Sequence, residues 1–289
     1  MLRILDHVSA AGLDSAVNED AWGAEARSAW VIDGATTILA PRMDPVSDAR
    51  WHASALSHEL HLRLASDGAD PVEPLRGAIA AIAEQAGDRY DDRTPPSSSV
   101  AVVVVGEGDP PACRFAALGD IAILHVTAPG SAVQAVRPIR LSPAETRFIE
   151  ESARLREGGL TRQEALDRVL GQVEERRTRV MNTDAGYWIA GLDPAAADHA
   201  LRGSLDCAAG TRILLMSDGF AAGQRYAVVD DWATVVSGGV PLAEVLRQIR
   251  AVEEADADGT VYPRLKRSDD ATAVLAEVVV AGGAPADGS

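Results

Sequence analysis

The chain has 289 residues, of which 47% are hydrophobic and 24% are charged, a composition typical of a globular protein with a sizeable apolar core. Its 43 acidic residues outnumber its 27 basic ones, and the net charge of -16 repels a nucleic-acid backbone or an anionic membrane, which excludes both as expected partners. The two cysteines, Cys113 and Cys207, have no Cys-x-x-Cys spacing and indicate neither a zinc site nor a disulfide framework.

The amino-terminal residues and the lengths of the apolar runs predict a soluble, cytoplasmic protein. Residues 1–7 include an acid and no apolar run long enough for a signal peptide. No later stretch approaches the roughly 20 apolar residues that a membrane-spanning helix needs. The low cysteine content fits a reducing compartment.

In the first part of the chain, short apolar runs predict strands, and apolar residues at three- and four-residue spacing predict helices. The predicted elements are, in chain order, a strand at 29–33, a turn at 34–37, a short strand at 38–40, and helices at 47–65 and 71–86. The continuously apolar run 100–105 then predicts a strand that is buried on both faces. A central sheet is therefore expected.

Two further strands, at 113–118 and 121–126, flank Gly119-Asp120, which is the arrangement of a hairpin with a tight turn. Such a turn would carry Asp120 to the end of the sheet. The remaining predicted elements are helices at 143–156, 161–177 and 241–254 and strands at 187–190, 212–217 and 271–280. Because strands and helices do not alternate strictly, the predicted fold class is an α+β layered domain.

Several acidic residues stand at predicted strand ends or beside glycines, and not on the solvated faces of helices. Asp33 and Asp218 each follow an apolar strand and precede a glycine, which permits a tight bend where the chain leaves the core. Asp20 ends an Asn-Glu-Asp run, and Asp269 begins an Asp-Asp-Ala-Thr run. A single Asp-Gly pair is typical of a turn, so the settings and the chain order of these acids carry the prediction.

Carboxylates that are brought together repel one another unless cations neutralise them. Their hard oxygen atoms favour magnesium, manganese or calcium over zinc. Two such ions roughly 3.5 to 4 Å apart lower the pKa of a shared water and clamp phosphoryl oxygens. The aspartates therefore predict a centre of two or more divalent metal ions that hydrolyses a phosphate ester.

Five motifs, taken in chain order, resemble the motif set of the type-2C metal-dependent protein phosphatases, the PPM family. They are Asn18-Glu19-Asp20, Val31-Ile32-Asp33-Gly34, Ala117-Leu118-Gly119-Asp120, the run from Leu214 to Gly219, and the run from Ser268 to Thr272. The resemblance covers about residues 5–280. It implies two antiparallel β-sheets packed face to face, with helices on both outer sides. The implied organisation is one domain over residues 1–280. The residues 281–289 include no bulky apolar group and predict a disordered tail.

The resemblance also implies a centre of two manganese or magnesium ions at one end of the sheets. Asp33 would bridge the two ions, and Gly34 would lend its backbone carbonyl. Asp218 and Asp269 would ligate the second ion. Asp33 and Asp218 would thereby hold the water that attacks phosphorus.

Further positions match members of the same family. Glu19 and Asp20 would bind the ions through waters. Asp120 matches an acid that, in many bacterial members, helps to hold a third and looser metal beside Asp218. The stretch 142–179 resembles the mobile flap of bacterial members and is the expected place for substrate selectivity.

The sequence departs from the family pattern in three places. The run Ala35-Thr36-Thr37 replaces His-Gly-Gly or Met-Gly-Gly, so a histidine acid at position 35 is absent. Ser15 stands where an arginine that grips the substrate phosphate is expected, and Asp270 stands where the family has an asparagine. The basic run 264–267 is typical of a solvated surface, and the alternative is that it draws an anionic substrate towards the metals.

The resemblance implies a magnesium- or manganese-dependent phosphatase that acts on phosphoserine and phosphothreonine in a phosphoprotein substrate. Two alternatives stay open. The departures at Ser15 and at 35–37 suggest a catalytically weak or inactive module that keeps the fold. A phosphatase of small phosphorylated metabolites fits the same ligands, because specificity lies in loops whose partners the sequence does not name.

Overall fold

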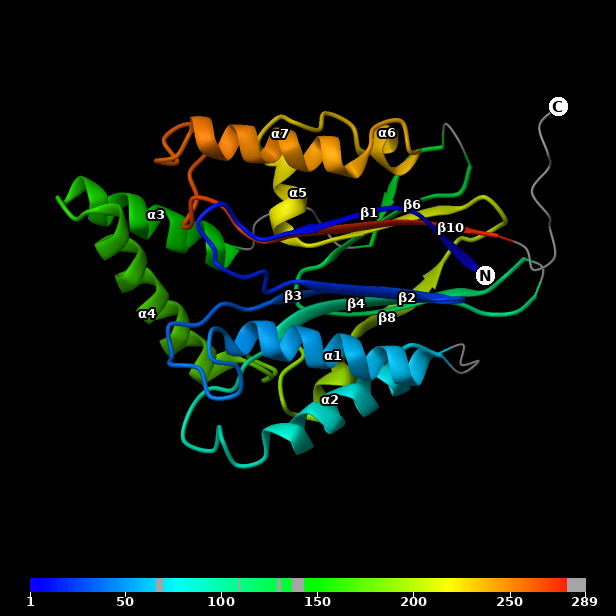
Figure 1. Ribbon diagram of the computed structural model, residues 1–289, viewed down its shortest axis with the longest axis horizontal. Coiled ribbons are helices and arrows are strands. Elements are labelled where there is room, and N and C mark those ends of the chain that lie inside the picture. The colour runs from blue at the N-terminus through cyan, green and yellow to red at the C-terminus, as the bar shows by residue number, and fades with distance from the viewer. Residues whose placement is uncertain (66–69, 109, 129–130, 137–142, 280–289) are drawn as a thin grey trace.

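Two antiparallel sheets of five strands each pack face to face, and helices cover both outer faces (Figure 1). The structure is a computed structural model that describes residues 1–65, 70–108, 110–128, 131–136 and 143–279. The predicted α+β class, with two packed antiparallel sheets flanked by helices on both sides, is confirmed. The predicted disordered tail at 281–289 lies outside the described residues.

The two sheets have the strand orders β1-β10-β9-β6-β7 and β2-β3-β4-β5-β8. The strands of the first sheet are β1 (Leu2–Ala10), β10 (Ala271–Val278), β9 (Arg212–Met216), β6 (Ala122–Val126) and β7 (Gln134–Ala135). The strands of the second sheet are β2 (Ala21–Glu25), β3 (Ser28–Gly34), β4 (Ser98–Val105), β5 (Cys113–Leu118) and β8 (Leu201–Leu205).

Apolar side chains on alternating strand positions fill three layers of core. In β4 every residue is buried. Val103 and Val105 face the other sheet, whereas Val102 and Val104 face the helices outside. The prediction that this strand is buried on both faces is therefore confirmed, and its continuous apolar run follows from the two-sided burial.

The helices fall into three groups. On the second sheet lie α1 (Asp48–Leu64), α2 (Val72–Ala86) and the short η1 (Pro194–His199). On the first sheet lie α5 (Asp218–Arg225), α6 (Trp232–Val236) and α7 (Leu242–Ala255). The third group is α3 (Pro143–Glu157) and α4 (Arg162–Val180). Among the described helices, none has both the length and the apolar character needed to cross a membrane.

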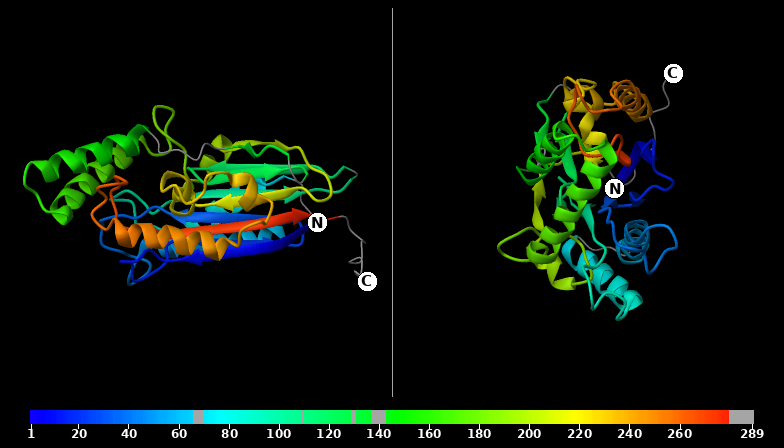
Figure 2. Two further views of the ribbon diagram at one scale, coloured as in Figure 1. Left: turned by 90° about the horizontal axis from the view of Figure 1, so that it is seen from above. Right: turned by 90° about the vertical axis from the view of Figure 1, so that its left-hand side faces the viewer.

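The pair α3 and α4 forms a helical hairpin that extends beyond one end of the sheets (Figure 2). It occupies the stretch 142–179 that the sequence analysis predicted as a flap, and Gly158-Gly159 forms its turn. Thr161 and Glu164 make a reciprocal capping box at the start of α4, which fixes where that helix begins. We refer to α3 and α4 together as the flap.

The predicted hairpin at Gly119-Asp120 is wrong. β5 pairs with β4 and β8 in the second sheet, whereas β6 pairs with β7 and β9 in the first. The two residues therefore carry the chain from one sheet to the other. Gly119 has a φ of 73°, and a Cβ atom there would lie 2.1 Å from Ser99 Oγ. The crossing places Asp120 between the ends of the two sheets.

Two other predicted strands are also wrong. Residues 38–40 have no strand structure, and residues 187–190 contribute only isolated bridges at Tyr187 and Ala190. The structure adds β1, β2, β7 and β8, which were not predicted. All four contain half-buried or exposed positions, so their apolar signal is weaker than that of the central strands.

We predict that Gly119→Ala lowers the free energy of unfolding by at least about 2 kcal/mol, because the alanine adds backbone strain at positive φ and a clash with Ser99. Chemical denaturation measures this loss. Gly210→Ala is the matched control, since Gly210 has a φ of 86° but nothing within 4 Å of an added Cβ. Equal losses in the two variants would contradict the proposed clash.

Candidate metal centre

Five acidic residues from separate segments gather at one end of the two sheets. Asp33 lies at the end of β3, and Asp20 precedes β2 directly. Asp218 begins α5 just after β9, and Asp269 lies shortly before β10. Asp120 lies at the crossing between β5 and β6. The predicted carboxylates therefore converge, while their role as metal ligands stays a prediction.

The charges of this group act on one another strongly. Burial raises the pKa of Asp33 well above its ordinary value, and the charges of Asp20 and Asp218 raise it further, followed by those of Asp120 and Asp269. Burial also raises the pKa of Asp218, and Asp269 and Asp120 add to the effect. Without a cation, such a site favours protonated carboxyl groups.

Asp20 has one carboxylate oxygen with a partner and one without. Ser217 Oγ donates to Asp20 Oδ2 at 2.9 Å. Asp20 Oδ1 is buried and has no hydrogen-bond partner in the described part of the chain. Burial raises the pKa of Asp20 to about 7, although the Ser217 and Thr272 hydrogen bonds oppose the rise. A buried oxygen left in this way is suited to a cation or a water bound to one.

Glu19 is held from both sides. Its carboxylate accepts hydrogen bonds from Thr36 Oγ1, at 2.5 Å, and from Ser47 Oγ, the N-cap residue of α1. Its backbone N–H donates to Asp270 Oδ2 at 2.6 Å. Asp270 Oδ1 accepts from the backbone N–H of Gly12 at 2.8 Å. Asp270 thus fastens the loop that carries Glu19 and Asp20.

The glycines that follow Asp33 and Asp218 are required by close backbone approach. A Cβ atom at Gly34 would lie 2.5 Å from the carbonyl oxygen of Glu19. A Cβ atom at Gly219 would lie 2.0 Å from the carbonyl oxygen of Asp270. Only glycine lets the segments that carry the acids pack this tightly.

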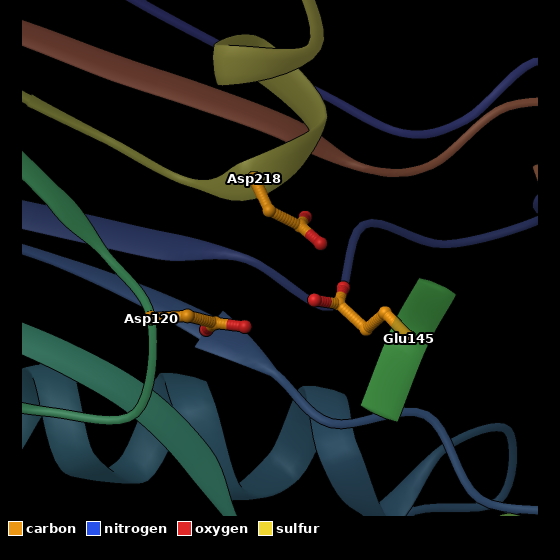
Figure 3. A group of neighbouring side chains, drawn as sticks. All are labelled: Asp120, Glu145 and Asp218. Atoms are coloured by element: carbon orange, nitrogen blue, oxygen red, sulfur yellow. The ribbon is translucent and has the colours of Figure 1, made fainter. Parts of the chain in front are cut away.

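Asp120, Asp218 and Glu145 form a group of three carboxylates, each with an oxygen within 4.8 Å of the others (Figure 3). Ser99 Oγ donates to Asp120 Oδ1 at 2.6 Å and fixes that side chain. Glu145 comes from the first turn of α3 in the flap. The sequence analysis did not single it out, because nothing local distinguishes it from the other acids of that helix.

The run Ala35-Thr36-Thr37, which departs from the family pattern, links the cluster to the flap. Thr36 donates its hydroxyl to Glu19, and its backbone carbonyl accepts from Arg177 Nη1 at 2.7 Å. Thr37 Oγ1 donates to Glu174 Oε2 at 3.0 Å. Arg177 and Glu174 both belong to α4, so the second flap helix is docked on this run.

Ser15 does not supply a group to the cluster. Its side chain is exposed, and its hydroxyl donates to the carbonyl oxygen of Val17 at 2.5 Å. Lys266, from the basic run 264–267, instead reaches the acids. Its Nζ donates to Asp269 Oδ1 at 2.8 Å. Burial acts to lower the pKa of Lys266, but the charge and hydrogen bond of Asp269 raise it above its ordinary value.

The donor set fits hard divalent cations. The converging side chains are carboxylates, burial and neighbouring charges oppose the ionisation of Asp33 and Asp218, and Asp20 Oδ1 is without a partner among the described residues. Magnesium and manganese prefer oxygen ligands of this kind. The described residues therefore provide the chemistry that a metal centre needs.

The sequence matches no protein-family model and no curated protein. The fold, however, is similar to those of solved phosphatases. The catalytic domain of the serine/threonine protein phosphatase PstP, in complex with 2 manganese ions, aligns with a TM-score of 0.56 and 19% identity over 96% of this chain and 99% of that one. The PPM Ser-Thr phosphatase MsPP from Mycobacterium smegmatis, in complex with cacodylate, aligns with a TM-score of 0.55 and 19% identity over 95% and 99%.

A third similar structure is PppA, a regulatory component of the type VI secretion system in Pseudomonas aeruginosa. It aligns with a TM-score of 0.55 and 18% identity over 96% of this chain and 97% of that one. Likeness at these identities establishes the fold alone. This chain has the fold of the PPM-type serine/threonine phosphatases, as the five motifs predicted.

We predict that manganese raises the melting temperature more at pH 8 than at pH 5. The pKa of Asp20 in the folded protein is raised from 3.8 to about 7. Protonated Asp20 therefore makes its full contribution to folding stability below pH 3.8, and this contribution is lost as the pH rises through about 7. Manganese needs the ionised carboxylates and replaces that contribution at high pH. Thermal unfolding with manganese or chelator at both pH values measures the effect, and an equal shift at pH 5 would contradict it.

Proposed function

We propose that this protein is a manganese- or magnesium-dependent phosphatase that hydrolyses phosphoserine and phosphothreonine in proteins. The observation that carries the proposal is the convergence of Asp20, Asp33, Asp218 and Asp269 at one end of the two sheets, with Asp20 Oδ1 lacking a partner in the described chain. The PPM-type fold supports the same conclusion.

In this proposal, Asp33 would contribute its carboxylate to both ions, and Gly34 would contribute its backbone carbonyl to one of them. Asp218 and Asp269 would hold the second ion. Bound ions of this kind would lower the pKa of a water and neutralise the phosphoryl oxygens. Glu19 and Asp20 would bind the ions through waters.

The other residues of the site keep these ligands in place. Thr36 and Ser47 fix the carboxylate of Glu19 from two directions. Asp270 ties the backbone of Glu19 to that of Gly12. Because the side chains are held before substrate arrives, little reorganisation is needed during the reaction.

In the proposal, the flap would complete a third metal site. Asp120 and Asp218 would hold this ion, and Glu145 would add a carboxylate from α3. Because Glu145 is on the flap, the ion would join the flap to the sheets. The flap position and the occupancy of the third site are then coupled.

A catalytically weak module with the same fold is the second candidate, and Ser15 is the observation that favours it. The Ser15 hydroxyl donates a hydrogen bond to the carbonyl of Val17, and it has no positive charge to bind a substrate phosphate. Hydrolysis of p-nitrophenyl phosphate with manganese, compared with chelator, separates this candidate from an enzyme. Phosphopeptides tested against phosphorylated metabolites then identify the substrate class.

We predict that Asp33→Asn and Asp218→Asn each lower manganese-dependent kcat/KM on p-nitrophenyl phosphate by orders of magnitude, because each variant removes a charge that neutralises the ions. The melting temperature without metal should stay the same or rise, since a buried repelling charge is lost. Asp230→Asn, at an exposed position, is the control. Unchanged manganese affinity of Asp218→Asn in calorimetry would refute the ligand assignment.

We predict that Glu145→Gln raises the manganese concentration for half-maximal activity by about tenfold, because one of three carboxylates loses its charge. Glu150→Gln on the same helix, at an exposed position, should leave that concentration unchanged. Manganese titrations of p-nitrophenyl phosphate hydrolysis measure both. If the two variants behave alike, Glu145 does not take part in metal binding.

A further inference from the structure

The loop between α7 and β10 is braced so that it presents Lys266 to the acidic cluster. Arg264 is buried, and its guanidinium donates to Asp256 Oδ2 at 2.7 Å, to the carbonyl of Tyr262 at 2.8 Å and to the carbonyl of Arg267 at 2.9 Å. The Asp256 carboxylate in turn accepts from three backbone N–H groups, those of Thr260, Val261 and Tyr262. These bonds fix the loop on both sides of Lys266.

Lys266 has one donor to spare at the edge of the cluster. Its ammonium donates to Asp269 Oδ1 at 2.8 Å and to Thr36 Oγ1 at 3.0 Å. An ammonium has three N–H donors, so one is free for another acceptor. The side chain is 33% exposed, which leaves it open to a ligand from solvent. Among the described residues, Lys266 is the basic side chain that donates a hydrogen bond to a predicted metal ligand, Asp269.

We propose that Lys266 binds the phosphate group of the substrate. This inference rests on the proposed function, since it concerns the same site. A phosphate monoester dianion that approaches clustered carboxylates is repelled, and an ammonium at the edge adds the positive charge that Ser15 does not supply. The free N–H of Lys266 donates to a phosphoryl oxygen while the other two hold the side chain on Asp269 and Thr36.

Three neighbouring arginines make hydrogen bonds or ion pairs elsewhere. Arg264 is buried and occupied by the loop that it braces. Arg267 pairs with the exposed Asp14 at 3.0 Å. Arg177 donates to the backbone carbonyl of Thr36 and lies 3.6 Å from Glu174 in its own helix. Arg267 is thus a matched control, because it is next to Lys266 and carries the same charge.

Lys266→Met in the manganese-loaded protein tests the proposal. The KM for p-nitrophenyl phosphate and the inhibition constant of inorganic phosphate should both rise about tenfold, with a smaller fall in kcat. Lys266→Arg should bring the KM and the inhibition constant close to the values of the parent protein. Arg267→Met should leave both constants unchanged. The manganese concentration for half-maximal activity should stay the same in Lys266→Met. Lys266→Gln, which keeps a hydrogen-bond donor, replaces the methionine variant if that variant fails to fold.

Two results would overturn the proposal. One is an unchanged KM and phosphate inhibition constant in Lys266→Met. The other is a change in manganese requirement alone, which would make Lys266 a positioning residue for Asp269. If the unaltered protein shows no metal-dependent hydrolysis, the proposed function fails separately. Calorimetric titration of the magnesium-loaded protein with inorganic phosphate then tests Lys266 by itself. Equal phosphate affinity in the parent protein and in Lys266→Met would exclude Lys266 as the phosphate-binding residue.

Discussion

The repulsion among buried carboxylates is the constraint to which the rest of the structure responds. Two unit charges roughly 5 Å apart repel by about 3 kcal/mol at an effective dielectric constant of about 20. Burial raises the pKa values of Asp33 and Asp218, and the charges of the neighbouring acids raise them further. Each acid sits at the end or the start of a strand whose interior is packed in the core, so the sheets hold the charges together. Protonation or a bound cation relieves the repulsion, and the two compete for the same oxygens.

Hydrogen bonds and close packing convert this convergence into a defined site. Asp270 accepts from the backbone of Gly12 and Glu19, and Arg264 braces the loop that precedes β10. Gly34 and Gly219 let neighbouring backbones approach where a Cβ atom would collide. The loop fastened by Asp270 connects β1 with β2, and the loop braced by Arg264 connects α7 with β10. The acids are therefore positioned by the scaffold, and their geometry does not depend on side-chain flexibility.

The flap meets the cluster at two separate places. Glu145 at the start of α3 lies beside Asp120 and Asp218, whereas Glu174 and Arg177 of α4 contact residues 36–37. The same Thr36 contacts Glu19 and Lys266. The run 35–37, which follows Asp33-Gly34, is thus the junction between the flap, the acidic cluster and Lys266. A change at this junction would act on all three together.

The sequence by itself determined the helices α1, α2 and α7, the doubly buried β4, and the acids at strand ends, because periodicity and chain breaks are local signals. The tertiary structure alone decided that Gly119-Asp120 crosses between sheets, since a local turn pattern does not tell which strand the next one will pair with. It also decided that Glu145 and Lys266 join the cluster. Glu145 looks like an ordinary charge in its own helix, and only the packing of the flap brings it to Asp120 and Asp218. Lys266 lies three residues from Asp269 in the chain, but its hydrogen bond to Thr36 is a contact between distant segments that only the tertiary structure provides.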